Sequence, residues 1–310
     1  MVSSGPGMNM GANCTQAERT AEQPLAVAWL GNTYSLSDQD SSDSLGRLTD
    51  VARRRTTLTV LRTEALTPHM QRVYLGDPGF ENFEPANFTD SYVKLIFGSE
   101  GEEVVRTYTV RSVDPDAREI AIDFVVHGDE GIAGPWAANA VTGDRIDFYG
   151  PNGAYSPRSD ADWHLFAGDE SAIPAISAAV EALPEDAIAK VFVEVADRKD
   201  EIYMETLALV DVTWVHRGAG SNEVGDDRAG DNAPLIEAVR ATEWLPGQAQ
   251  VFIHGEAQAV MHNLRRYIRK ERGIGAEWAS ISGYWRRGRT EEGFRVWKRE
   301  LAQAEESVQA

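Results

Sequence analysis

The sequence predicts a closed antiparallel β-barrel followed by an α/β domain with a doubly wound parallel sheet. Two patterns carry this prediction. From residue 56 to 150, β-branched and aromatic residues form short runs that Gly, Pro and Asp interrupt, as in consecutive β-hairpins. Beyond residue 160, near-continuous apolar strands alternate with segments of helical spacing, as expected for strands covered on both faces. The change of period therefore separates an all-β part from an α/β part.

The barrel prediction rests on the number and spacing of the short runs. There are six of them in about 95 residues, which indicates a closed sheet of six antiparallel strands. The predicted strands are 57–61, 70–75, 92–97, 106–111, 119–127 and 145–149.

The α/β prediction rests on four apolar strands with helices between them. Ile173, Ile176 and Val180 are spaced three and four residues apart, which predicts a helix after the first of these strands. The predicted strands are 163–167, 190–196, 212–215 and 250–254. The expected organisation is a disordered extension (1–52), the barrel (53–157), the α/β domain (158–285), and a C-terminal signature with a helix (286–310).

Composition restricts the classes of partner. The net charge of −19 argues against nucleic acid or an anionic membrane as a partner. The single cysteine, Cys14, excludes an internal disulfide and a Cys-ligated iron–sulfur cluster, and the six histidines show no metal-ligand spacing. No apolar run approaches ~18 residues, and no secretory signal is recognisable, so a cytoplasmic, monomeric protein is expected.

The most informative segment is Arg-Thr-Tyr-Thr-Val-Arg-Ser at 106–112. Arg106 and Tyr108, two apart in a strand, project from the same face and offer a cation and an aromatic plane. The Gly-rich turn 128–134 then leads into a helical segment whose backbone N–H groups suit a phosphate. This order suits a flavin dinucleotide held across a barrel. The alternative is that Tyr108 fills the barrel and Arg106 is a solvated surface charge.

Several motifs together resemble a known family. R-x-Y-T at 106–109, a strand ending in His127, G-P-W-A at 134–137 and G-P-N-G-A-Y at 150–155 resemble the flavin domain of siderophore-interacting proteins. These are FAD-containing ferric-siderophore reductases of the ferredoxin-reductase superfamily. Downstream, 168–176 resembles their nicotinamide-side loop and 284–288 their C-terminal signature. The resemblance runs from about residue 55 to 290 and implies an FAD-binding barrel before a ferredoxin-reductase-like nucleotide domain.

On the barrel side, the resemblance implies roles for individual residues. Arg106 would neutralise the FAD pyrophosphate, Tyr108 would pack against the isoalloxazine, and Thr109 would place a hydroxyl near its ring nitrogens. Trp136 is expected to brace the helix start, and His127 either contacts the ring or only ends a strand. The residues expected to bind FAD are Arg106, Thr107, Tyr108, Thr109, Val126, His127, Gly134, Pro135, Trp136 and Ala137.

On the nucleotide side, the resemblance places Gly168, Asp169, Glu170, Ser171, Gly255, Glu256 and Trp285 at the junction of flavin and nicotinamide. Two adjacent carboxylates would repel a pyrophosphate, so this turn is not expected to grip phosphate tightly, and Asp169 or Ser171 can instead cap the next helix. Trp285 covers the flavin or the adenine, or fills a domain seam.

Cations after two of the parallel strands bear on the choice of electron donor. Arg198 and Lys199 follow the second strand and Arg217 follows the third, where a 2′-phosphate would need positive charge. These residues favour NADPH over NADH, with Arg217 as the main reader of the phosphate. The alternatives are ordinary loop charges, paired with Asp197 or Asp200, and a ferredoxin donor.

The resemblance also implies a basic pocket for an anionic ferric siderophore, formed by Lys94, Arg286 and Arg287. Lys94 interrupts an apolar strand, but alternation also permits an outward-facing lysine. Only one of the two adjacent arginines can easily face the pocket. The expected activity is reduction of ferric siderophores by NADPH through FAD. The alternatives are a flavin reductase with another acceptor and a non-catalytic siderophore-binding module.

Overall fold

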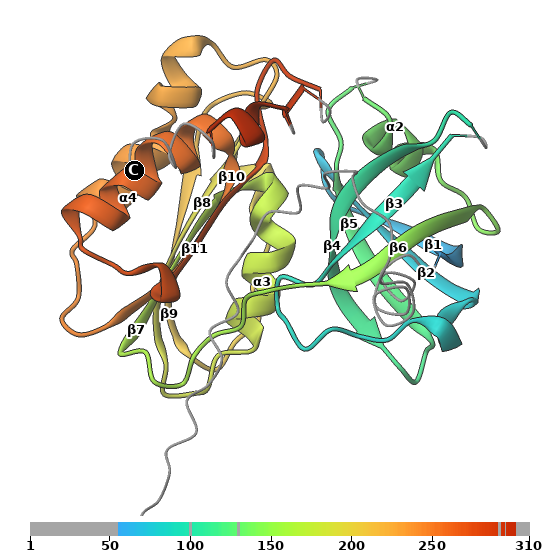
Figure 1. Ribbon diagram of the computed structural model, residues 1–310, viewed down its shortest axis with the longest axis horizontal. Coiled ribbons are helices and arrows are strands. Elements are labelled where there is room, and N and C mark those ends of the chain that lie inside the picture. The colour runs from blue at the N-terminus through green and yellow to red at the C-terminus, as the bar shows by residue number, and fades with distance from the viewer. Residues whose placement is uncertain (1–54, 99–100, 129–130, 291–292, 295, 302–310) are drawn as a thin grey trace, which may run out of the picture. The chain divides into compact units, whose positions relative to one another are not determined.

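The computed structural model describes residues 55–98, 101–128, 131–290, 293–294 and 296–301. These residues all belong to one compact unit of the chain, Leu45–Ala310. They form a barrel and a parallel sheet, as the sequence predicts (Figure 1). The predicted extension 1–52 lies outside the described residues.

Six antiparallel strands close the barrel in the order β1-β2-β5-β4-β3-β6. They are β1 (Arg55–Thr67), β2 (Met70–Pro78), β3 (Tyr92–Phe97), β4 (Val104–Asp114), β5 (Glu119–Val125) and β6 (Arg145–Asn152). Alternate side chains fill the interior, among them Leu95, Phe124 and Phe148. Helix α2 (Ala133–Asn139) adds Ala133 and Ala137 to the same core. Because β5 ends at Val125, His127 lies two residues beyond the strand that was predicted to contain it.

The second sheet has five parallel strands in the order β11-β10-β7-β8-β9. They are β7 (Trp163–Asp169), β8 (Ile188–Val195), β9 (Leu209–His216), β10 (Ala249–Glu256) and β11 (Ala279–Trp285). The first four correspond to the predicted strands. The fifth, β11, was not predicted, because Ser280, Ser282 and Gly283 break the apolar run by which a buried parallel strand is recognised.

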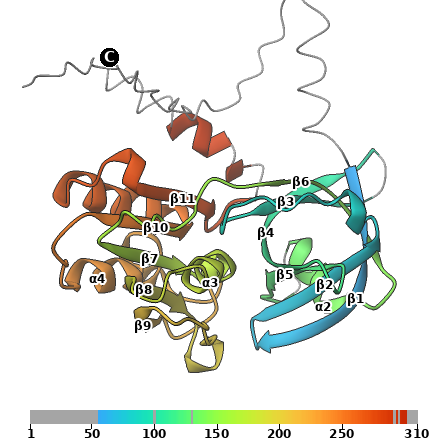
Figure 2. The same cartoon turned by 90° about the horizontal axis from the view of Figure 1, so that it is seen from below.

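Helices cover both faces of this sheet. Helix α3 (Ile173–Glu181) packs on one face, and α4 (Pro234–Ala241) packs on the other with the helical segments Gln258–Leu264 and Tyr267–Glu271 (Figure 2). Successive residues of β7 alternate between the two cores: Phe166 belongs to the α3 core, and Leu165 and Ala167 belong to the α4 core. The carboxyl ends of the strands meet at one edge, where ligands bind in such sheets.

Contacts join the barrel to the sheet within this unit. Met70 of β2 belongs to the α3 core. Arg111 of β4 donates to the Glu181 carboxylate at the end of α3, at 2.9 Å for one of the two bonds, and His69 Nδ1 lies 2.9 Å from Asp200 Oδ1. Among the described residues, no helix is long and apolar enough to cross a membrane.

Candidate functional site

Strand pairing fixes the faces of the R-x-Y-T segment. In the ladder between β3 and β4, Arg106 lies opposite Leu95 and Tyr108 lies opposite Val93, so both project from the face that carries these two core residues. Thr107 lies opposite Lys94 on the other face, and both are exposed. The cation and the aromatic ring therefore share one face, as their spacing predicts, whereas Lys94 belongs to the opposite face.

Aromatic contacts bring Tyr108 and the start of α2 together. The Tyr108 ring lies 4.4 Å from the Phe124 ring, and the Phe124 ring lies 5.6 Å from the Trp136 indole. Trp136 also packs edge-on against Phe97, at 5.7 Å, so it fastens α2 to the barrel. At Gly134, a Cβ would lie 3.1 Å from the Val125 carbonyl oxygen, so glycine allows this close approach of helix and strand.

The chemistry of these groups fits a flavin dinucleotide. The Arg106 guanidinium is half-buried and donates to the Val105 carbonyl oxygen at 3.0 Å. Tyr108, on the same face, is also half-buried. At the start of α2, Pro135 has no backbone N–H and the Trp136 N–H donates to the Ile132 carbonyl oxygen at 3.1 Å, so residues 134–137 offer fewer backbone donors than the sequence suggests. A cation, an aromatic ring and the start of a helix thus lie in one region of the barrel.

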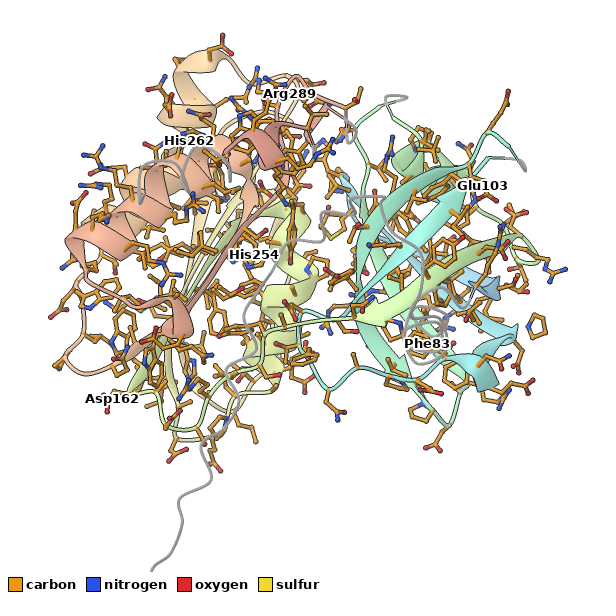
Figure 3. The ribbon with its side chains drawn as sticks, viewed as in Figure 1. Phe83, Glu103, Asp162, His254, His262 and Arg289 are labelled. Atoms are coloured by element: carbon orange, nitrogen blue, oxygen red, sulfur yellow. The ribbon has the colours of Figure 1, made fainter. Side chains whose placement is uncertain are left out.

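Aromatic residues of two motifs pack around Phe252 and His254 of β10, and a third motif contacts Tyr284 through Thr109. His254 is labelled in Figure 3. Its ring stacks on Phe252 at 3.9 Å and meets Tyr284 edge-on at 4.8 Å. Tyr155, which ends the motif at 150–155, packs 4.7 Å from Phe252. The Tyr284 hydroxyl shares a hydrogen bond with Thr109, which connects β11 to the flavin motif. Burial lowers the pKa of His254 to about 3, so the imidazole is neutral at physiological pH.

The sequence does not indicate that these motifs meet at β10. His254 is one histidine in an apolar strand, and nothing in its spacing distinguishes it from a core residue. Its Nε2 lies 2.9 Å from the Ser280 hydroxyl oxygen, on the strand β11 that was itself not predicted. The two motifs at 150–155 and 284–288 each carry a tyrosine, Tyr155 and Tyr284. These two tyrosines were the signal in the sequence that could have indicated the contact.

Asp169 connects the predicted nicotinamide-side residues. It is buried and accepts from the Ser171 backbone N–H and hydroxyl, from Glu256 N at 2.7 Å, and from Trp285 Nε1 at 2.9 Å. Gly255 has a φ of +146°, and a Cβ there would lie 2.7 Å from Asp169 Oδ2, so only glycine fits. Burial raises the pKa of Asp169, while these donors oppose that shift. The structure thus brings 168–171, 255–256 and Trp285 together.

Arg217 is paired with carboxylates of its own chain. It is only 3% exposed, and its guanidinium donates to Glu170 Oε2 at 2.9 Å, to Glu194 Oε1 at 3.3 Å and to the Ala219 carbonyl oxygen at 3.1 Å. A second bond joins Arg217 Nη2 to Glu170 Oε1. Two buried carboxylates already hold this cation, which opposes its predicted role as the reader of a 2′-phosphate. Burial raises the pKa of Glu170, and it raises that of Glu194 to about 7.

The two arginines of the C-terminal signature are also engaged. Arg286 Nη1 donates to Glu256 Oε1 at 2.8 Å, and Arg287 Nη2 donates to the Val224 carbonyl oxygen at 2.5 Å. The Arg287 guanidinium also lies 3.6 Å from Asp226. Both predicted substrate cations therefore contact carboxylates of their own chain, and their pairing opposes a simple role as open anion ligands.

The remaining predicted residues lie apart from these pairs. Arg198 is exposed in the turn Arg198–Asp200 after β8, where the Asp197 side chain accepts from Lys199 N at 2.7 Å. His127 Nδ1 lies 3.1 Å from the Asn222 side-chain nitrogen. A small cleft at the sheet edge is lined, among others, by Asp169, Glu194, Arg217, Glu256, Trp285 and Arg287.

Comparison with known proteins identifies the family. The model of the siderophore-interacting FAD-binding domain matches residues 59–105 and 99–155, and the model of the siderophore-interacting protein matches 161–288. An uncharacterized protein of Mycobacterium tuberculosis is 58% identical over 79% of this chain and 95% of its own length. The ferric vibriobactin reductase ViuB of Vibrio cholerae is 30% identical over 76% and 91%. The NADPH-dependent ferric-chelate reductase of Escherichia coli is 27% identical over 68% and 85%.

Solved structures agree in fold. A siderophore utilization protein from T. fusca, 36% identical, superposes with a TM-score of 0.66 over 76% of this chain and 94% of its own. A ferredoxin NADP+ reductase from Neisseria gonorrhoeae, 15% identical, has a TM-score of 0.55 over 74% and 99%. The fold is therefore that of ferredoxin reductases, and the relatives named as ferric reductases support an oxidoreductase. The chain belongs to the family of siderophore-interacting proteins with an FAD-binding domain.

Proposed function

We propose that this chain is a ferric-siderophore reductase that passes electrons from NADPH through FAD to Fe(III) and so releases Fe(II). The observation that carries the proposal is the β4 segment. It presents a cation and an aromatic ring beside α2, and its Thr109 contacts the C-terminal strand. Relatives named as ferric reductases support the same activity.

The barrel residues would hold FAD, which when bound supplies the redox chemistry between a two-electron donor and a one-electron acceptor. In this proposal Arg106 neutralises the pyrophosphate, Tyr108 offers its plane to the ring system, and the backbone at 134–137 holds phosphate. Tyr284 fixes the Thr109 hydroxyl at the seam between β4 and β11. These residues bind and orient, and no acid–base residue has to act on the iron chelate.

NADPH as the donor rests on fewer residues than the sequence suggested. With Arg217 held by two carboxylates, the cations at the strand ends that support a 2′-phosphate contact are Arg198 and Lys199. Both are exposed after β8. The Escherichia coli relative is named for its use of NADPH, which is consistent with the same donor.

The substrate in this proposal is a ferric chelate of oxygen ligands. Fe(II) binds hard oxygen donors more weakly than Fe(III), so reduction releases the metal. The exposed Lys94 would attract an anionic chelate. Arg286 and Arg287 would contribute only when they leave Glu256 and Asp226.

Trapping Fe(II) with ferrozine tests the proposed function. The purified protein should be yellow, should bleach on anaerobic addition of NADPH, and should then regain its colour as a ferric siderophore yields coloured Fe(II)–ferrozine. The control is Arg106→Ala/Tyr108→Ala, which should lack both flavin and activity. Bleaching followed by electron transfer to free flavin or quinone, without Fe(II) from any siderophore, would indicate a reductase with another acceptor. A colourless protein that binds ferric siderophore would indicate a binding module.

A further inference from the structure

The Arg217 guanidinium is held by two buried carboxylates. Glu170 and Glu194, which hold the guanidinium, are 5% and 6% exposed. Glu194 Oε2 also accepts from Leu235 N at 2.8 Å, which fixes this carboxylate at the start of α4. Glu170 belongs to the turn Glu170–Ala172 that directly follows β7. The cation and both carboxylates are therefore positioned by three different parts of the sheet edge.

The charge balance of this cluster opposes an additional anion. One guanidinium faces Glu170 and Glu194, and the buried Asp169 lies near enough to interact electrostatically with all three groups. To contact a phosphate, Arg217 would have to leave two buried carboxylates without their counter-ion, which is strongly unfavourable.

We infer that the triad of Arg217, Glu170 and Glu194 removes discrimination for the 2′-phosphate, so that the protein accepts NADH about as well as NADPH. The inference rests on the proposed function in that it concerns its nicotinamide donor. In this inference Arg217 determines specificity because its carboxylate partners keep it from contacting the nucleotide. The exposed Arg198 and Lys199 contribute only a small preference, because water and salt screen exposed charges.

Calorimetric titration with two nucleotide fragments tests the inference without turnover. The flavin-loaded protein is titrated with AMP and with adenosine 2′,5′-bisphosphate, which differ only in the 2′-phosphate. For the wild type, the two dissociation constants should agree within about threefold, far less than a charge-assisted contact would give. Stopped-flow reduction of the flavin by NADH and by NADPH should show the same near-equality.

Releasing Arg217 should create the missing preference. Glu170→Gln/Glu194→Gln keeps the shape of both side chains but removes their charge, so the guanidinium becomes available to an anion. The 2′-phosphorylated fragment should then bind at least tenfold more tightly than AMP. Adding Arg217→Met to this variant should abolish the gain. The matched control is Glu201→Gln, which removes a carboxylate that contacts His216 at the end of β9 but not Arg217.

Two results would overturn the inference: a wild type that prefers the 2′-phosphorylated fragment by more than tenfold, or a released variant that gains no preference. Circular dichroism and flavin content establish that the double variant folds, and the two single Glu→Gln variants, each expected to gain part of the preference, replace it if it does not. Failure of the proposed function is distinguishable, since it appears as a wild type without flavin, or as a reduced flavin that yields no Fe(II).

Discussion

The barrel and the parallel sheet both carry candidate cations, but these cations lie in different environments. On the barrel, Lys94 is exposed, and Arg106 is half-buried on the same face as the Tyr108 ring. At the sheet edge, Arg217 is buried between Glu170 and Glu194, and Arg286 pairs with Glu256. At the sheet edge, the fold thus places carboxylates directly against the candidate cations, which opposes their use as ligands for an anion. This contrast supports the proposal that the barrel binds the cofactor and that Arg217 has a structural role.

The largest effect is expected on replacing Arg217. Arg217→Ala leaves two buried carboxylates without their counter-ion, so the free energy of unfolding should fall by about 3–5 kcal/mol. Urea unfolding followed by circular dichroism measures this loss. Arg198→Ala, which removes an exposed cation after the neighbouring strand, should stay within about 0.5 kcal/mol of the wild type. Equal losses for both variants would erase the contrast between a structural and an available cation.

Stability should also depend on pH through Glu194. Its pKa is about 7 in the folded protein against 4.5 ordinarily, so the folded state holds the proton more tightly. Stability therefore falls as pH rises from 4.5 through 7, and the pKa values of Glu170 and Asp169, raised by burial, act in the same direction. His254, whose pKa drops from 6.5 to about 3, costs stability only below pH 6.5.

Between pH 6.5 and about 8, the pH dependence of stability consequently reports on the buried carboxylates and not on His254. The urea midpoint of the wild type should decline across this interval, and Glu194→Gln should decline less. A wild-type midpoint that rises with pH, or a variant with an undiminished slope, would contradict the buried state of this carboxylate.

A smaller effect is expected at the seam between barrel and sheet. Tyr284→Phe removes the hydroxyl that holds Thr109 and should lower the free energy of unfolding by about 1 kcal/mol. Tyr155→Phe is the matched control, because among the described residues the buried Tyr155 hydroxyl has no hydrogen-bond partner. It should leave stability unchanged or slightly higher. The reverse order of the two variants would reject the Thr109 contact.

The smallest effect is expected for Lys94. Lys94→Ala should slow the reduction of anionic ferric chelates severalfold while flavin content stays unchanged, since an exposed charge mainly affects encounter rates. The difference should shrink as salt rises, because screening acts over about 10 Å at 0.1 M ionic strength. Rates for neutral and anionic chelates distinguish the outcomes. An equal, salt-independent loss for both would return Lys94 to a structural role in the barrel wall.

The sequence predicted the architecture better than it predicted the charge pairs. Periodicity alone indicated the barrel and four parallel strands, because burial on one or both faces determines the spacing of apolar residues. The partners of Arg217 could not be predicted in this way, since Glu170 and Glu194 are 47 and 23 residues away in the chain. Only the parallel order of β7, β8 and β9 brings their carboxyl ends together.

Flavin content and stability, measured side by side in two variants, test the contrast most directly. Arg106→Ala/Tyr108→Ala should unfold close to the wild type in urea once flavin is removed from both, yet bind added FAD much more weakly or not at all. Arg217→Ala should unfold at lower urea but bind FAD with nearly wild-type affinity under conditions where it is folded. The opposite pattern, with flavin retained in the barrel variant and lost in a folded Arg217 variant, would contradict the assignment of the cofactor site to the barrel.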